Sequence, residues 1–147
     1  MTAPTVTDAL QAALAGENAC VYAYGLVGAH VVGDQRRRAQ SALDSHRARR
    51  GSVSRLLLDA SATPAPAAAA YDPPFPVTDG ASARRLAGYV EDRLALVWAD
   101  VVGAASGAQD PGLLATAAAA VQEASVRAAG WTGATSAFPG VGATSSR

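Results

Sequence analysis

Four side chains that could take part in chemistry fall near the middles of four predicted helices. The chain contains only three glutamates, Glu17, Glu91 and Glu123, which lie in the first, third and fourth of these helices. The second helix has no glutamate but carries His46 near its middle. If the helices pack as a bundle, the four side chains lie at a similar depth. Carboxylates and an imidazole in that arrangement can bind a metal ion or form a buried polar cluster.

Glu17 is predicted to lie on the buried face of its helix. Residues spaced alternately four and three apart share one helix face. One such series runs through Leu10, Leu14, Glu17, Val21, Tyr24, Gly28 and Val31. A carboxylate on this apolar face is costly unless it is paired, protonated or bound to a metal. We therefore expect a partner for Glu17, and the candidates are Tyr24, His46 and a metal ion.

Two chemical interpretations of these residues stay open. In the first, they form a polar cluster without any cofactor, in which Glu91 pairs with an arginine such as Arg50 or Arg127, or a buried glutamate stays protonated. In the second, a divalent ion (iron, manganese or zinc) binds among the four candidates. That candidate metal site consists of Glu17, His46, Glu91 and Glu123.

Hydrophobic periodicity and capping residues predict the four helices that position these side chains. The first is capped by Thr7 or Asp8 and ends between His30 and Val32. A Gly33–Asp34 turn follows, and Asp34 caps a second helix that ends at Asp59. The third begins after Thr78 or Asp79 and ends near Ala105. Its successor starts at Pro111 behind the cap Asp110 and ends near Ala129, where Gly130 terminates it.

The segment between the second and third helices, residues 61–80, is rich in proline. It holds five of the eight prolines, which exclude a continuous helix there. Tyr71, Phe75 and Val77 indicate that it packs onto the bundle. The chain is therefore predicted to form an all-α four-helix bundle with a long crossover between helices two and three. We expect one domain over residues 1–139, onto which Trp131 and Phe138 fold back, and a disordered tail over residues 140–147.

Composition excludes several classes of function. The formal net charge is zero, so no overall basic field favours nucleic acid or an anionic membrane as a partner. There is no lysine, which excludes Schiff-base chemistry and a phosphate-binding P-loop. Aromatic residues make up only 5% of the chain, so the apolar area buried per residue is modest. A paired helix face would add to it, and we expect a homodimer.

The single cysteine and the N-terminal sequence predict a cytoplasmic protein. Cys20 has no partner for an internal disulfide and is expected to be a buried apolar residue. The first ten residues have neither the basic nor the apolar region of a signal peptide. No apolar stretch is long enough for a transmembrane helix.

Several segments of the chain resemble known sequences. They are LAGENACVYAYGLVGAH, SHRARR, AYDPPFPVTDGASARRLA, VEDRLALVWADVV, AVQEASVRAAGW and AFPG, which together cover nearly the whole chain. On these segments the chain resembles the ferritin-like superfamily, and more closely the alanine-rich ferritin-like domain of unknown function found in actinobacteria. The resemblance implies the ferritin-like four-helix bundle and no established activity.

Compared with the ferritin-like di-iron pattern, this chain lacks two ligands. That pattern has a glutamate on each of two helices and Glu-x-x-His on each of the others. Glu17 and Glu91 match the single glutamates, whereas Leu43 and Val126 stand where a glutamate and a histidine are needed. Two irons would be under-ligated, which argues against oxidase or oxygenase chemistry.

We therefore expect a ferritin-like bundle with a degenerate di-iron site that acts as a non-catalytic structural or interaction module. The alternative is a metal-binding protein with a reduced carboxylate and histidine site in the bundle core.

Overall fold

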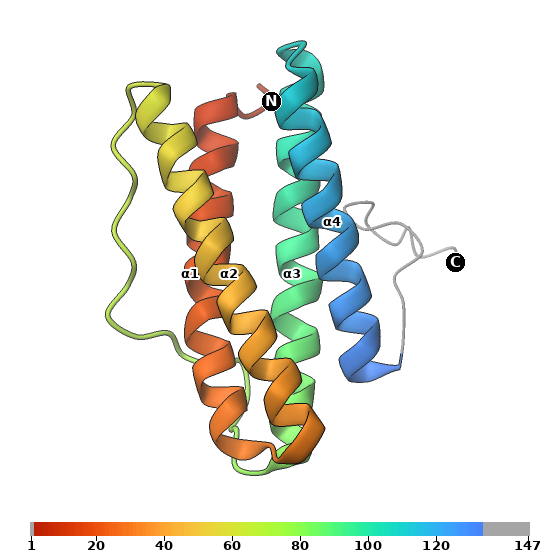
Figure 1. Cartoon of the computed structure of the whole chain (residues 1–147). Coiled ribbons are helices and arrows are strands. Elements are labelled where there is room, and N and C mark those ends of the chain that lie inside the picture. Colours follow the sequence, from red (N-terminus) through yellow and green to blue (C-terminus); the bar gives the residue numbers. More distant parts are fainter. Residues whose placement is uncertain (1, 134–147) are drawn as a thin grey trace, which may run out of the picture.

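The computed structural model describes residues 2–133, which form a bundle of four helices without strands (Figure 1). The helices are α1 (Val6–His30), α2 (Gly33–Asp59), α3 (Gly80–Gly107) and α4 (Pro111–Thr132). None of the helices in that range combines the length and the hydropathy needed to cross a lipid bilayer. Phe138 and the predicted tail over residues 140–147 lie outside the described residues. The all-α prediction is confirmed.

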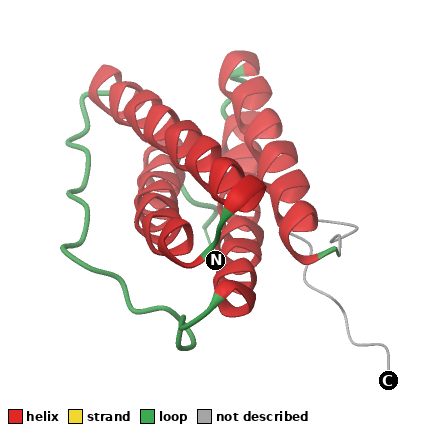
Figure 2. Cartoon of the chain, turned by 60° about the horizontal axis from the view of Figure 1, so that its bottom comes forward, coloured by secondary structure: helices red, strands yellow, loops and turns green. Residues whose placement is uncertain are grey.

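Backbone packing follows the order α2, α1, α3, α4. Helix α1 packs against both α2 and α3, and α4 packs against α3. Helices α2 and α4 have no close backbone contact, so side chains alone span the space between them. The crossover between α2 and α3 runs the length of the bundle outside α1 before α3 starts (Figures 1 and 2). As predicted, this connection is long and not helical.

Side-chain caps fix where three of the helices begin. Thr5 caps α1, because its hydroxyl oxygen accepts from the backbone N–H of Asp8 at 3.1 Å. The Asp8 carboxylate in turn accepts from the backbone N–H of Thr5 at 3.2 Å, which completes a capping box. The predicted cap at Thr7 or Asp8 was therefore wrong. Asp79 and Asp110 cap α3 and α4 as the sequence predicts.

Two predicted helix ends were wrong because glycines act at other positions. Helix α2 starts at Gly33, whose φ of +57° favours glycine, and not behind an Asp34 cap. Helix α4 continues through Gly130 to Thr132 and ends at Gly133, which has φ +74°. The N–H of Gly133 donates to the carbonyl of Ala129 at 2.7 Å. This extension places Trp131 on the helix, where it is buried.

The crossover is tied to the bundle at both of its ends. Near its start, the Gln11 amide donates to the carbonyl of Thr63 at 2.8 Å and accepts from the N–H of Ala65 at 3.0 Å. Near its end, Phe75 and Val77 pack against the apolar core, as predicted. The crossover is therefore part of the packed structure.

Close packing of α3 on α4 depends on Gly88. A Cβ atom at this position would lie 2.2 Å from Cγ2 of Thr132, a distance that forces a shift. We expect Gly88→Ala to destabilise the fold by about 1–3 kcal/mol through overpacking, although alanine is the better helix former. Gly103→Ala is the matched control on the same helix, because a Cβ there meets nothing within 4 Å. Gly103→Ala should stabilise the fold by about 0.5–1 kcal/mol. Urea unfolding measures both variants, and a change in unfolding free energy of the same sign in both would contradict this packing argument.

Candidate functional site

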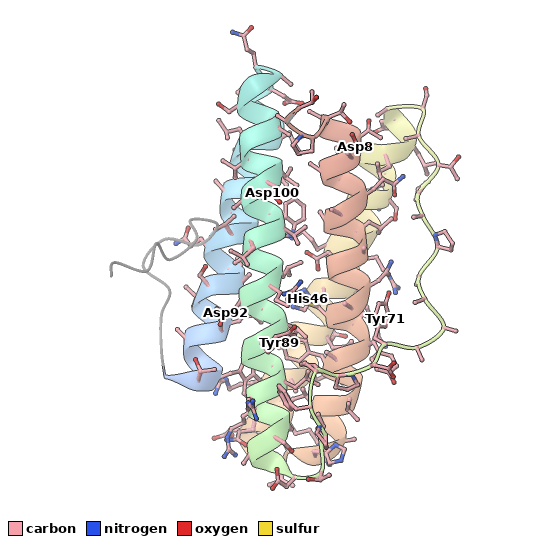
Figure 3. All side chains as sticks on the ribbon, turned by 180° about the vertical axis from the view of Figure 1, so that it is seen from behind. Asp8, His46, Tyr71, Tyr89, Asp92 and Asp100 are labelled. Atoms are coloured by element: carbon pink, nitrogen blue, oxygen red, sulfur yellow. The ribbon has the colours of Figure 1, made fainter. Side chains whose placement is uncertain are left out.

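Glu17, His46 and Glu91 meet in the centre of the bundle. Nδ1 of His46 lies 2.7 Å from Oε2 of Glu17, and Nε2 lies 2.9 Å from Oε1 of Glu91. All three residues are at most 2% exposed. Figure 3 shows His46 in the interior, level with the middle of the helices. We refer to these three residues, from α1, α2 and α3, as the Glu–His–Glu triad.

Three aromatic donors extend the triad into a chain that joins all four helices. Nε1–H of Trp98 donates to Oε1 of Glu17 at 2.8 Å. The hydroxyl of Tyr24 donates to Oε1 of Glu91 at 2.7 Å and accepts from Nε1–H of Trp131 at 2.9 Å. Because Trp131 belongs to α4, this last bond brings the fourth helix into the network. The buried polar groups are thereby paired largely with one another.

The geometry and the neighbouring charges favour a protonated imidazole at His46. A neutral imidazole has one N–H, whereas here each ring nitrogen faces a carboxylate oxygen. Burial lowers the pKa of His46, but the hydrogen bonds and charges of Glu17 and Glu91 outweigh burial and raise the pKa to about 9. Tyr24, whose ring stacks on His46 with centroids 5.4 Å apart, stays a neutral donor. Burial and the neighbouring Glu91 raise the pKa of its hydroxyl.

The two carboxylates of the triad differ in how many of their oxygens accept a hydrogen bond. Both oxygens of Glu17 accept a hydrogen bond, one from Trp98 and one from His46. In Glu91, Oε1 accepts two bonds, whereas Oε2 is buried and has no partner among the described residues.

Glu123 is not brought together with the other three candidates. Its side chain is 47% exposed and pairs with Arg49 of α2 and, at 4.0 Å, with Arg127. The buried positions of α4 are Leu113, Ala117, Ala120, Ala124, Ala128 and Trp131. Glu123 comes one residue before the buried Ala124, so its side chain lies about 100° away around the helix. Its side chain instead points to the gap between α2 and α4.

The expected partners of the glutamates were right in one case. His46 does bind Glu17, as predicted from the apolar face. Tyr24 binds Glu91 instead of Glu17, and no arginine among the described residues pairs with Glu91. The prediction of Arg50 or Arg127 was therefore wrong. Trp98 and Trp131 were missed as donors, although a buried Trp needs a partner for its N–H and the chain has only two.

The donor set does not fit a di-iron centre. A ligating histidine must offer a nitrogen lone pair to the metal, whereas both nitrogens of His46 are engaged by carboxylates. Val126, at the position of the missing histidine, is 65% exposed. Across residues 2–133, no three His, Cys, Asp or Glu side chains are arranged to hold a metal ion. The triad therefore supports no chemical step through iron.

The raised pKa of His46 predicts how stability depends on pH. A folded-state pKa of about 9, against an ordinary 6.5, gives a contribution that is complete below pH 6.5 and lost as the pH rises through 9. Its size is on the order of 3 kcal/mol. Urea unfolding between pH 6 and 10 measures this loss. His30→Gln should retain it and His46→Gln should abolish it; a wild-type profile that stays flat over this range would contradict an imidazolium in the triad.

Substituting the two glutamates separates charge from hydrogen bonding. Glu17→Gln leaves one acceptor oxygen for two donors, so an amide NH2 must face Trp98 or His46. It should cost about 1–3 kcal/mol. Glu91→Gln removes the same charge, but its NH2 can occupy the position of Oε2, which no donor faces among the described residues. We expect a clearly smaller loss by urea unfolding; equal losses would mean that charge, not donor geometry, controls both sites.

Comparisons with known proteins identify the family and the fold of this chain. Residues 9–143 match the family described as "Domain of unknown function (DUF4439)". A conserved hypothetical protein from Mycobacterium tuberculosis is similar at 36% sequence identity and a TM-score of 0.78, over 84% of this chain and 91% of that one. A ferritin-like, diiron-carboxylate protein from Bacillus anthracis is similar in fold, with a TM-score of 0.75 and 14% identity, over 86% of this chain and 91% of that one. No curated protein matches significantly. The chain therefore belongs to this family of unknown function, and its fold is a ferritin-like four-helix bundle.

Proposed function

We propose that this protein is a non-catalytic ferritin-like module whose Glu–His–Glu triad takes the place of a metal centre. The observation that carries the proposal is that His46 faces a carboxylate with each ring nitrogen, at 2.7 and 2.9 Å. An imidazolium in this position supplies positive charge between two buried carboxylates. A metal ion would do the same in a di-iron bundle.

An imidazolium differs from a metal ion in what it can do chemically. It has no open coordination position, does not bind oxygen or substrate, and undergoes no redox change. Its protons are directed at Glu17 and Glu91, and all three side chains are at most 2% exposed. What remains is a buried charged network that fixes the relative positions of α1, α2 and α3. Buried networks of this kind favour one packing arrangement over others more than they raise stability.

The module is proposed to act through its outer surface. Large apolar side chains are exposed on several elements, including Val32 before α2, Leu58, Leu96 and Val126. These can contribute to protein contacts, and the homodimer expected from the sequence is part of this proposal. Sedimentation of the full chain at increasing concentration measures that association.

A metal-binding function is the second candidate, and the unpartnered Oε2 of Glu91 favours it. Among the described residues, this buried oxygen is the one triad atom without a hydrogen-bond partner. A divalent ion bound there would need His46 to give up a proton and a hydrogen bond. Binding would then strengthen as the pH rises past the pKa of His46, which is about 9.

Metal analysis and thermal unfolding decide between these functions. We expect protein purified without chelators to carry far less than one iron, manganese or zinc ion per chain. A chelator, or added Fe(II), Mn(II) or Zn(II), should leave the melting temperature unchanged. An ion at 100 times its Kd would stabilise the fold by about 2.7 kcal/mol, which raises the melting temperature by several degrees.

Glu91→Gln is the control variant for this measurement, because it removes the free oxygen without emptying the core. A stoichiometric metal that is lost in Glu91→Gln would overturn the proposed metal-free function and support the second candidate. A metal retained by Glu91→Gln but lost in Glu123→Gln would place binding in the α2–α4 gap instead.

A further inference from the structure

A second feature of the fold is a cavity of about 370 Å³ on the side of the α1–α3 pair that the crossover covers. Small side chains of α1 form one wall, among them Ala15, Gly16 and Ala19. Val90 and Leu94 of α3 form a second wall, and residues 71–74 of the crossover form the third. Its lining includes neither His46 nor Glu91, so the cavity is separate from the polar centre of the triad.

The cavity is held open by rigid walls. The crossover carries Pro73 and Pro74 at this point, and their fixed φ angles limit how far the segment can collapse inward. Ring contacts anchor the crossover on either side: Tyr71 packs on Tyr22 with centroids 5.5 Å apart, and Phe75 meets Tyr89 edge-on at 6.3 Å. Figure 3 shows Tyr71 and Tyr89 on the side of the molecule where the crossover passes. Together with the hydrogen bonds of Gln11, these contacts fix the third wall.

The groups that line the cavity include aromatic rings and two unpaired charges. Tyr22, Tyr71 and Tyr89 all belong to the lining. Arg93 lies over the ring of Tyr89 at 5.7 Å, and no carboxylate in residues 2–133 forms an ion pair with it. Asp72, on the crossover, likewise has no ion pair within that range. The cavity therefore offers aromatic surface, with one unmatched charge of each sign on solvent-exposed side chains at its rim.

A second cavity of similar size lacks this property. It measures about 360 Å³ and lies in the α2–α4 gap, lined by Glu17, His46, Arg49, Glu123 and Arg127 among others. Its charged groups are already paired: Arg49 and Arg127 with Glu123, and Glu17 with His46. A ligand there would have to break existing ion pairs, whereas a ligand beside Arg93 and Asp72 would form new ones.

We propose that the cavity between α1, α3 and the crossover binds a small aromatic zwitterion, the chemical class to which free aromatic amino acids belong. The ring lies among the tyrosines and the alanines of α1. Arg93 binds the carboxylate and Asp72 binds the ammonium group. Pockets of about 300–1,000 Å³ with mainly apolar walls and a few polar groups are typical of small-ligand sites. An engineered cavity of about 150 Å³ already holds benzene, so the space suits a ring with a short polar chain.

Calorimetric titration of the full chain with three matched probes tests this proposal. Phenylalanine carries both charges, 3-phenylpropionate lacks the ammonium group and phenethylamine lacks the carboxylate. We expect phenylalanine to bind with a Kd of about 1 mM or tighter. Each of the other two should bind about tenfold more weakly, because each leaves one charge of the cavity unmatched. No detectable binding of phenylalanine, or equal affinity for all three probes, would overturn the proposal.

Variants of the lining make the test specific to this cavity. Arg93→Gln should weaken the binding of phenylalanine and 3-phenylpropionate while sparing that of phenethylamine. Asp72→Asn should weaken the binding of phenylalanine and phenethylamine while sparing that of 3-phenylpropionate. Arg47→Gln and Asp100→Asn, on exposed positions outside the lining, are the charge-matched controls and should change nothing. Ala19→Leu should fill the cavity and abolish binding, with circular dichroism confirming the fold. Binding that survives Ala19→Leu and both charge variants would place the ligand elsewhere and refute the assignment. Because Glu91 and His46 do not line the cavity, failure here leaves the metal-free function untouched.

Discussion

The fold is organised around an imidazolium between two buried carboxylates. Glu17 and Glu91 lie on different helices, and each would carry an unpaired charge into an apolar interior if His46 were absent. Removing one partner of a buried ion pair is far more destabilising than replacing the whole pair by apolar residues, because a lone buried charge remains. The helices that carry these residues are therefore constrained to one register. Helix α1, which contacts both α2 and α3, is the element through which this constraint acts.

Aromatic side chains supply the remaining hydrogen bonds of the buried network. Trp98 satisfies the second oxygen of Glu17, and Tyr24 with Trp131 links Glu91 to α4. Helix α4 is lined by alanines that pack closely but offer no side-chain polar atom to the core. The indole N–H of Trp131 is thus the polar contact by which α4 joins the centre. It exists because α4 runs past Gly130 to Gly133 before it ends.

The sequence predicted the fold better than the site, for physical reasons. Helix periodicity, the proline-rich crossover and the caps Asp79 and Asp110 are local features, so the bundle could be read from the chain. The burial of Glu17 also followed from its helix face. The partner of Glu91 could not be predicted in this way. Tyr24 and Arg127 both fit the helical pattern, and only the orientation of the helices in the packed bundle selects one. Glu123 failed for the same reason: α4 is so rich in alanine that its pattern does not define a buried face within about 100°.

The two missing ligand positions agree with the proposal that the His46 imidazolium, and not a metal ion, lies between the two carboxylates. A glutamate in place of Leu43 would bring a third carboxylate toward a single imidazolium, whereas Leu43 packs in the core. On α4, Val126 is largely exposed, so a histidine there would face solvent. Glu123 is correspondingly turned to Arg49, which also lies over the ring of Trp98 at 5.7 Å. With Glu123 and Val126 on the exposed side of α4, restoring one ligand would not rebuild a di-iron site. A di-iron site would require α4 to turn on its axis and a ring nitrogen of His46 to be released from its carboxylate.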